Sequence, residues 1–149
     1  MSLLIYTDGS CYLQDKEQPG GWAYAIIRDS EIIQSAKGQE FNTTNNRMEV
    51  RAALEGLKAA EDLKDRGAPT VITDSQFLVN SVTIWFQSKH ARRDPNATPG
   101  MLALHEMIVE IKERSLRLGV EFAWIKGHSG DLYNEFVDTL AGDARRGYL

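Results

Sequence analysis

Four acidic residues stand where carboxylates could do chemistry. Asp8 and Asp74 each follow a short apolar run typical of a β-strand, so each charge would lie beside the core. Asp8 belongs to the predicted turn Asp8-Gly9-Ser10, and Glu49 and Asp138 lie near the starts of predicted helices. Strand ends and helix starts meet at one edge of an α/β sheet, so we expect the four acids to converge there.

Four carboxylates at one place would require cations. Two like unit charges about 4 Å apart repel by about 4 kcal/mol at an effective dielectric constant of 20. Magnesium prefers oxygen ligands, and two divalent ions about 3.5–4 Å apart can activate water and stabilise a leaving oxygen. Such a site suits phosphodiester hydrolysis. Singly, each acid has a simpler explanation, as a turn residue or as a partner of a helix dipole, but together they favour a metal site.

The elements that must position these acids follow from the hydrophobic patterning. Three early runs rich in β-forming residues predict strands over residues 3–7, 22–28 and 32–37. Asp29 and Ser30 separate the last two strands, which predicts a hairpin.

Alternating strands and helices follow the hairpin. Apolar residues at helical spacing predict a helix through residues 50–60 that ends at Gly67. A short strand over 71–73 and a second helix through 77–82 come next. The pattern therefore changes from hairpins to βα units.

The last third of the chain continues the alternation. A third helix through 101–111 should end near Gly119, before a strand over 120–125. A glycine-rich loop over 127–130 then leads into a final helix through 136–144. This order of elements predicts an α/β fold with a mixed sheet and helices on both faces.

Length and composition bound the class of protein. The 149 residues suffice for one domain over 1–149, which would bury about 70% of the surface of the unfolded chain. Cys11 is the single cysteine and can form no intramolecular disulfide, and the first apolar run stops at Asp8, too soon for a signal peptide or membrane span. We therefore expect a cytoplasmic protein. Its net charge of −4 means that a polyanionic partner would need local basic groups or bound cations.

Five segments occur in a characteristic order. They are Thr7-Asp8-Gly9-Ser10, Thr44-Asn45-Asn46-Arg47-Met48-Glu49, Thr73-Asp74-Ser75-Gln76, Lys126-Gly127-His128 and residues 134–138. From about Ser2 to Arg146 the chain resembles ribonuclease H of type 1, the bacterial-type ribonuclease HI family. The resemblance implies the ribonuclease H-like fold, a five-stranded mixed sheet in strand order 3-2-1-4-5 flanked by helices on both faces. It also implies magnesium-dependent, sequence-nonspecific endonucleolytic cleavage of the RNA strand of RNA·DNA hybrids.

The resemblance also implies residue roles. The metal-binding and catalytic carboxylates would be Asp8, Glu49, Asp74 and Asp138, holding two Mg²⁺ ions with substrate bound, or Mn²⁺ as a substitute. His128 matches a loop histidine that assists proton transfer or product departure; without the motif it would be an ordinary exposed loop residue. Hydrolysis would leave 3′-hydroxyl and 5′-phosphate ends, and the implied biological setting is DNA replication.

Substrate contacts follow from the same resemblance. The implied set is Gly9, Ser10, Cys11, Thr44, Asn45, Asn46, Gln76, Trp85, Lys89, Arg92 and Arg93. Cys11, Asn45 and Gln76 match positions that contact RNA, and asparagine and glutamine can both donate to and accept from a 2′-hydroxyl. Thr44 and Asn46 match positions near the DNA strand. One of Thr44, Asn45 and Asn46 should also cap the helix that follows.

The chain departs from the family pattern around the first loop. Residues 12–21 form a longer, charged loop that lacks the family's asparagine, which leaves Gln14 or Gln18 to replace an RNA contact. Asn42 stands where many members carry an arginine for a DNA phosphate, which implies a weaker phosphate pocket.

Bacterial members of the family carry a protruding basic loop rich in Trp and Lys, and this chain has fewer such residues there. Residues 88–100 predict an exposed basic loop, in which Asp94 opposes the cations. Trp85 either packs on the substrate backbone or ends a helix in the core. Trp22 and Trp124 lie within predicted strands and are expected in the core.

Two other functions remain open at this point. A DNA nuclease or junction resolvase could place similar acids on the same fold, and a hybrid-binding module could have lost turnover. Equal cleavage of duplex DNA and hybrid would favour the first, whereas the intact set of four acids disfavours the second. In each case the expected partner is nucleic acid, with no membrane association and a monomeric state.

Overall fold

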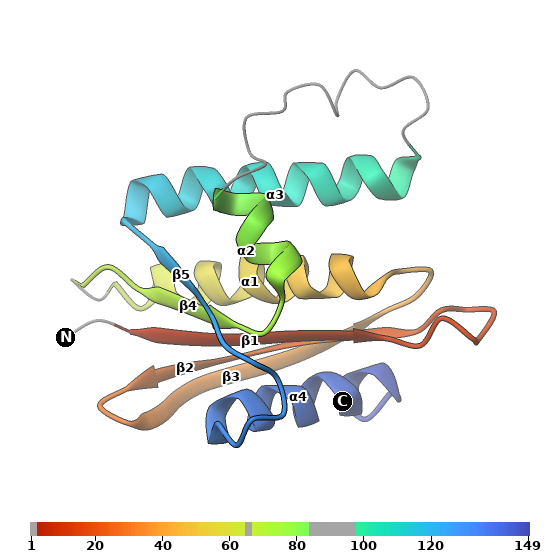
Figure 1. The fold of residues 1–149 in the computed structure, drawn as a ribbon, viewed down its shortest axis with the longest axis horizontal. Coiled ribbons are helices and arrows are strands. Elements are labelled where there is room, and N and C mark those ends of the chain that lie inside the picture. Colours follow the sequence, from red (N-terminus) through yellow and green to blue (C-terminus); the bar gives the residue numbers. More distant parts are fainter. Residues whose placement is uncertain (1–2, 65–66, 84–97) are drawn as a thin grey trace.

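A five-stranded sheet and four helices make up the part of the chain described by the computed structural model, residues 3–64, 67–83 and 98–149 (Figure 1). The strands are β1 (Leu4–Cys11), β2 (Gly20–Arg28), β3 (Glu31–Glu40), β4 (Thr70–Thr73) and β5 (Glu121–Trp124). The helices are α1 (Asn45–Asp62), α2 (Gln76–Thr83), α3 (Pro99–Leu118) and α4 (Leu132–Arg145). Among these residues, no helix has the length and apolar character needed to cross a membrane.

The sheet has the strand order β3-β2-β1-β4-β5, which confirms the order that the family resemblance implies. β1 to β3 are antiparallel neighbours, whereas β4 runs parallel to β1 and β5 parallel to β4. Asp29 and Ser30 have φ values of 52° and 66°, the left-handed pair that a tight hairpin turn requires, which confirms the predicted hairpin. The parallel strands β1, β4 and β5 therefore have their carboxyl ends at the same end of the sheet.

Helices cover both faces of this sheet (Figure 1). Helices α1, α2 and α3 lie on one face and α4 lies on the other. Side chains alternate along each strand, so Ile5 faces the larger core with α1, and its neighbour Tyr6 faces the smaller core with α4. Trp22 packs against the larger core, which confirms that prediction.

The first strand runs further than predicted. β1 continues through Asp8-Gly9-Ser10 to Cys11, and these residues pair with β2 instead of forming a turn. The glycine there permits the close approach of a helix and is not a sign of chain reversal: a Cβ atom at Gly9 would lie 2.3 Å from the backbone of Met48 and Glu49.

Two helix boundaries and the position of one acid also differ from prediction. α1 ends at Asp62 and not at Gly67, because Leu63 and Lys64 donate to carbonyls three residues back and tighten the last turn. Pro99 and Gly100 begin α3, capped by Thr98, although they were expected in the basic loop. Asp138 lies in the middle of α4, not near its start.

Candidate active site

Two neighbouring strands position Asp8 and Asp74. The parallel pairing of β1 with β4 ends at Thr7 and Thr73, and the next residue in each chain segment is one of these aspartates. Ser75 Oγ accepts a hydrogen bond of 3.0 Å from the backbone N–H of Leu78 and so starts α2 directly after Asp74. Both carboxylates therefore leave the sheet at the same edge.

The start of α1 brings Glu49 to the same point. Thr44 Oγ1 accepts from the backbone N–H of Arg47 at 3.1 Å, so Thr44 is the one of the three candidate residues that caps the helix. The lack of a side chain at Gly9 lets this first turn lie against β1. Asp8 and Glu49, 41 positions apart in the sequence, thus become neighbours.

Three carboxylates form a compact cluster. One oxygen from each of Asp8, Glu49 and Asp74 lies within 4.8 Å of the others. Burial, followed by the charges of Glu49 and Asp74, raises the pKa of Asp8 far above its usual range. Burial and the charge of Asp74 likewise raise the pKa of Glu49. Asp138 on α4 adjoins the cluster, since its carboxyl group also raises the pKa of Asp8.

The donor set fits a divalent cation. It consists of carboxylate oxygens alone, the ligands that magnesium and similar hard cations prefer. The Glu49 Oε1 atom is buried and has no hydrogen-bond partner among the described residues, so it lacks the compensation that burial demands. A cation would compensate this oxygen and the mutual repulsion of the acids.

Asp74 is supported by two residues that were not among the site residues predicted from the sequence. Trp124 Nε1 donates to the Asp74 carbonyl at 2.9 Å, and Asn134 Nδ2 donates to Asp74 Oδ2 at 3.4 Å. Trp124 is 45% exposed, so its predicted place in the core is wrong: it ends the edge strand β5, and its ring reaches toward the loop after β4. Asn134 precedes Asp138 by four residues, a spacing that puts both on one face of α4 and could have identified it.

The glycine-rich loop also reaches Asp74. Ile125 donates its backbone N–H to the Thr73 carbonyl at 2.9 Å, and a Cβ atom at Gly127 would lie 2.8 Å from Asp74 Oδ2. His128 follows with a left-handed φ of 56° and an exposed side chain. The structure thus puts the backbone next to His128 against the carboxylate cluster, with the imidazole open to solvent.

The predicted substrate contacts divide by exposure. Thr44, Asn45, Asn46 and Gln76 are exposed around the cluster, and Gly9 and Ser10 are half-buried in β1. Cys11 is buried: its thiol contacts the carbonyls of Gln18 and Thr43, and its backbone N–H donates to Asn45 Oδ1 at 2.7 Å. Trp85, Lys89, Arg92 and Arg93 lie outside the described residues.

The divergent first loop closes onto the segment before α1. The backbone N–H of Asn42 donates to the Glu17 carbonyl at 2.7 Å, and Arg47 Nη1 donates to the Asn42 carbonyl at 3.0 Å. Gln14 Oε1 accepts from the Tyr12 hydroxyl at 3.1 Å. Asn42, where the resemblance leads us to expect an arginine, is thus held through its backbone.

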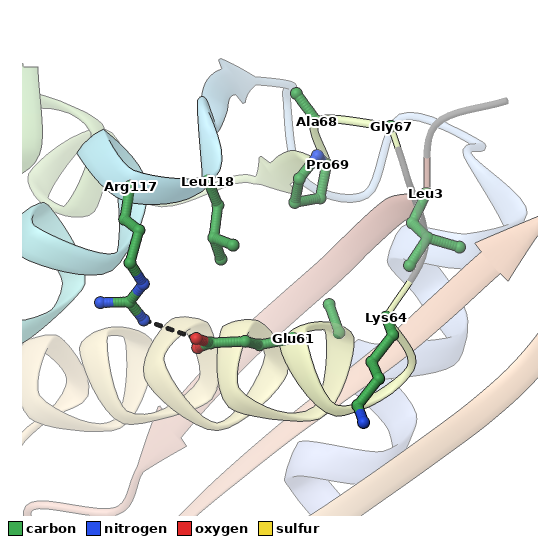
Figure 2. A pocket seen from close by; sticks show the side chains of 9 residues that line it. Leu3, Glu61, Lys64, Gly67, Ala68, Pro69, Arg117 and Leu118 are labelled. Atoms are coloured by element: carbon green, nitrogen blue, oxygen red, sulfur yellow. Dashed lines mark hydrogen bonds and ion pairs between the residues drawn. The ribbon is translucent and has the colours of Figure 1, made fainter.

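A separate pocket of about 260 Å³ lies where α1 and α3 end and β1 and β4 begin (Figure 2). Its polar wall is an ion pair between Glu61 and Arg117, and Arg114 also pairs with Glu61. The amino ends of parallel strands are opposite to the edge that holds Asp8 and Asp74, so this pocket is distinct from the carboxylate site.

Comparison with known proteins agrees with this geometry. The family model described as RNase H matches residues 1–146. Ribonuclease H of Hydrogenovibrio crunogenus is 39% identical over 140 residues, which cover 94% of this chain and 92% of that relative. Another relative, ribonuclease HI of Campylobacter jejuni, is also 39% identical over 140 residues, covering 94% of this chain and 88% of its own.

A solved structure extends the comparison to the fold. LC9-RNase H1, described as a type 1 RNase H with the type 2 active-site motif, superposes with a TM-score of 0.79. It shares 27% identity, and the match covers 99% of this chain and 73% of that one. With the strand order and the carboxylate cluster already established, these matches show that the chain belongs to the ribonuclease H family of hydrolytic endonucleases.

Proposed function

We propose that Asp8, Glu49, Asp74 and Asp138 hold the divalent cations with which the chain cleaves its substrate. As a member of the ribonuclease H family, the chain hydrolyses the RNA strand of RNA·DNA hybrids. The observation that carries the residue assignment is the convergence of three buried or half-buried carboxylates within 4.8 Å at the sheet edge. Bound Mg²⁺ would activate a water molecule and stabilise the leaving oxygen.

The side chains of the site have distinct tasks in this proposal. The carboxylates bind and orient the cations. Trp124 holds Asp74 by its backbone carbonyl, and Asn134 holds it by its carboxylate. His128 is exposed beside the cluster, where its imidazole could move a proton to or from the departing strand. Hydrolysis by water leaves 3′-hydroxyl and 5′-phosphate ends and needs no nucleophile from the protein.

Discrimination of the hybrid from duplex DNA would depend on side chains that hydrogen-bond to the 2′-hydroxyl of ribose. Asn45 and Gln76 are exposed and are the first residues of α1, which carries Glu49, and of α2, which follows Asp74. Their amides can both donate to and accept from a 2′-hydroxyl in the wide minor groove. Asn45 already accepts from the Cys11 backbone N–H through Oδ1, which fixes its orientation and directs its amide nitrogen to other partners.

We further propose Mg²⁺ as the working ion, with Mn²⁺ as a substitute, and a monomeric cytoplasmic enzyme that serves DNA replication. The oxygen-only donor set supports a hard cation, and the lone Cys11 is consistent with a reducing compartment.

One cleavage experiment tests the proposal. End-labelled RNA·DNA hybrid, single-stranded RNA, duplex RNA and duplex DNA are each incubated with the protein in Mg²⁺ or in EDTA. We expect Mg²⁺-dependent cuts in the RNA of the hybrid alone, and a loss of at least about 100-fold in rate for Asp8→Asn, because Asn removes a charged ligand. Glu106→Gln, which removes an exposed acid on α3, is the matched control and should retain activity.

Each contrary outcome has a defined meaning. Comparable cleavage of duplex DNA would indicate a DNA nuclease instead. Binding of hybrid without cleavage would indicate a hybrid-binding module. Wild-type turnover by purified Asp8→Asn would overturn the assignment of the carboxylates.

A further inference from the structure

A cleft of about 570 Å³ lies between the loop that joins β1 to β2 and the end of α4. It is lined by three aromatic residues, Tyr12, Phe41 and Tyr148, and by two arginines, Arg145 and Arg146. None of these residues belongs to the carboxylate cluster. The cleft is therefore a candidate binding surface of its own.

Most of the exposed aromatic rings of the described residues lie in this one cleft. Four aromatic side chains are exposed in the described part of the chain, and three of them line this cleft: Tyr12 at 47%, Phe41 at 50% and Tyr148 at 64%. Exposed rings gathered in one depression offer apolar faces to a flat partner. Nucleobases are such partners, and they stack on aromatic side chains regardless of sequence.

The arginines add a cationic component and connect the cleft to the active site. Arg145 Nη1 donates to Ser10 Oγ at 3.1 Å, and Ser10 is two residues from Asp8 along β1. The Arg146 guanidinium lies 5.8 Å from the centre of the Tyr148 ring and also pairs with Asp143 at 2.8 Å. A base on the rings would thus have guanidinium groups near its phosphate.

Acidic residues in the cleft favour single-stranded RNA over duplex or DNA as its ligand. Asp15 and Glu17 line the cleft from the loop. Asp15 Oδ1 accepts from the Glu17 backbone N–H at 3.1 Å, so this carboxylate also fixes the loop. Carboxylates repel the dense charge of a duplex, but they accept hydrogen bonds from ribose hydroxyls, which DNA lacks.

We propose that this cleft binds one or two unpaired ribonucleotides that continue the RNA strand of a hybrid held at the active site. The inference rests on the proposed function, because Ser10, a substrate contact that the family resemblance implies, accepts a hydrogen bond from Arg145 and so links the cleft to the active site. Bases stack on Tyr12, Phe41 and Tyr148, phosphates lie near the arginines, and ribose hydroxyls face the loop acids.

The test compares hybrids that differ only in their ends. A 12-base-pair RNA·DNA hybrid is prepared blunt, with a five-nucleotide single-stranded RNA extension at either end, or with the same extensions as DNA. Dissociation constants are measured in EDTA by fluorescence anisotropy, and kcat/KM in Mg²⁺. We expect an RNA extension to tighten binding roughly tenfold over the blunt hybrid, the size of one or two stacking contacts.

Variants locate the effect. Tyr12→Ala and Phe41→Ala should bring the extended hybrid to the blunt value, while kcat/KM on the blunt hybrid stays within about twofold. Leu13→Ala is the matched control, because Leu13 is 53% exposed in the same loop but does not line the cleft. Circular dichroism of each variant checks that it is folded.

The outcomes separate this inference from the proposed function. If the blunt hybrid is cleaved but extensions do not change its affinity, the cleft does not bind RNA and the inference is wrong. An equal gain from DNA extensions would overturn the ribose preference. Self-association that Phe41→Ala abolishes would assign the cleft to a second copy of the chain. Failure to cleave any hybrid would instead count against the proposed function.

Discussion

Asp74 depends on two side chains outside the carboxylate set. Asn134 is 2% exposed and donates to Asp74 Oδ2, so it fixes the direction in which that oxygen points. We expect Asn134→Ala to lower kcat by about 10- to 100-fold, the usual cost of losing a group that orients a metal ligand. The concentration of Mg²⁺ needed for half-maximal rate should rise, whereas KM for the hybrid should change little.

The control for this prediction is Asn80→Ala on α2, which removes the same group from a half-buried position elsewhere. An unchanged Mg²⁺ dependence in Asn134→Ala would mean that Asn134 supports only the packing of α4.

Single site residues could be predicted where a charged residue stands next to an apolar, buried segment. Asp8 and Asp74 stand out because each charge directly follows a run of buried or half-buried strand residues. Trp124 gave no such signal: a large apolar residue in a strand is expected inside, and only the three-dimensional fold shows that its strand is at the edge. The cleft residue Arg145 was also missed, because its partner Ser10 is 135 positions away.

At the level of elements, the contact between β1 and α1 is the one that assembles the site. We expect Gly9→Ala to destabilise the fold by about 2 kcal/mol or more, because the new methyl group meets backbone atoms of Met48 and Glu49 that cannot move alone. Activity should fall with it, since Glu49 would shift. Urea denaturation monitored by circular dichroism measures the free energy of unfolding.

Gly142→Ala is the matched glycine substitution. Gly142 lies inside α4, and a Cβ atom there would be 3.4 Å from the flexible end of the Arg146 side chain. Helix propensity predicts a stabilisation of about 0.5–1 kcal/mol. Equal effects of the two substitutions on stability would contradict a close approach of α1 to β1.

Most elements were predictable, and their ends were not. The runs of β-forming residues in β1 and β2 predict strands because those two strands are buried on both faces of the sheet, and the helical spacing through Val50 to Ala60 reflects the buried face of α1. The ends depend on partners distant in the sequence. β1 continues past Asp8 because β2 is there to pair with it, a fact that no local pattern in residues 3–11 contains.

At the scale of the whole molecule, the carboxylate cluster makes stability depend on pH and on metal. In the metal-free fold the raised pKa values of Asp8 and Glu49 keep protons bound that the unfolded chain releases above about pH 4. Unfolding then releases protons, so each rise of one pH unit costs up to about 1.4 kcal/mol of stability per retained proton. This contribution is fully present below about pH 4 and is lost as pH rises toward the folded-state pKa values.

We therefore expect the Tm in EDTA to fall between pH 5 and pH 8. Mg²⁺ should raise the Tm most at the upper end of this range, because it binds the deprotonated carboxylates of the folded chain and compensates their repulsion. Asp8→Asn should flatten the pH dependence in EDTA, because it removes the carboxyl group whose pKa is raised by burial and by the charges of Glu49 and Asp74. Glu106→Gln should not, as that acid is exposed on α3. Identical slopes for the wild type and Asp8→Asn would show that the three acids do not share one electrostatic site, which would remove the main physical reason for the chain to bind a divalent cation there.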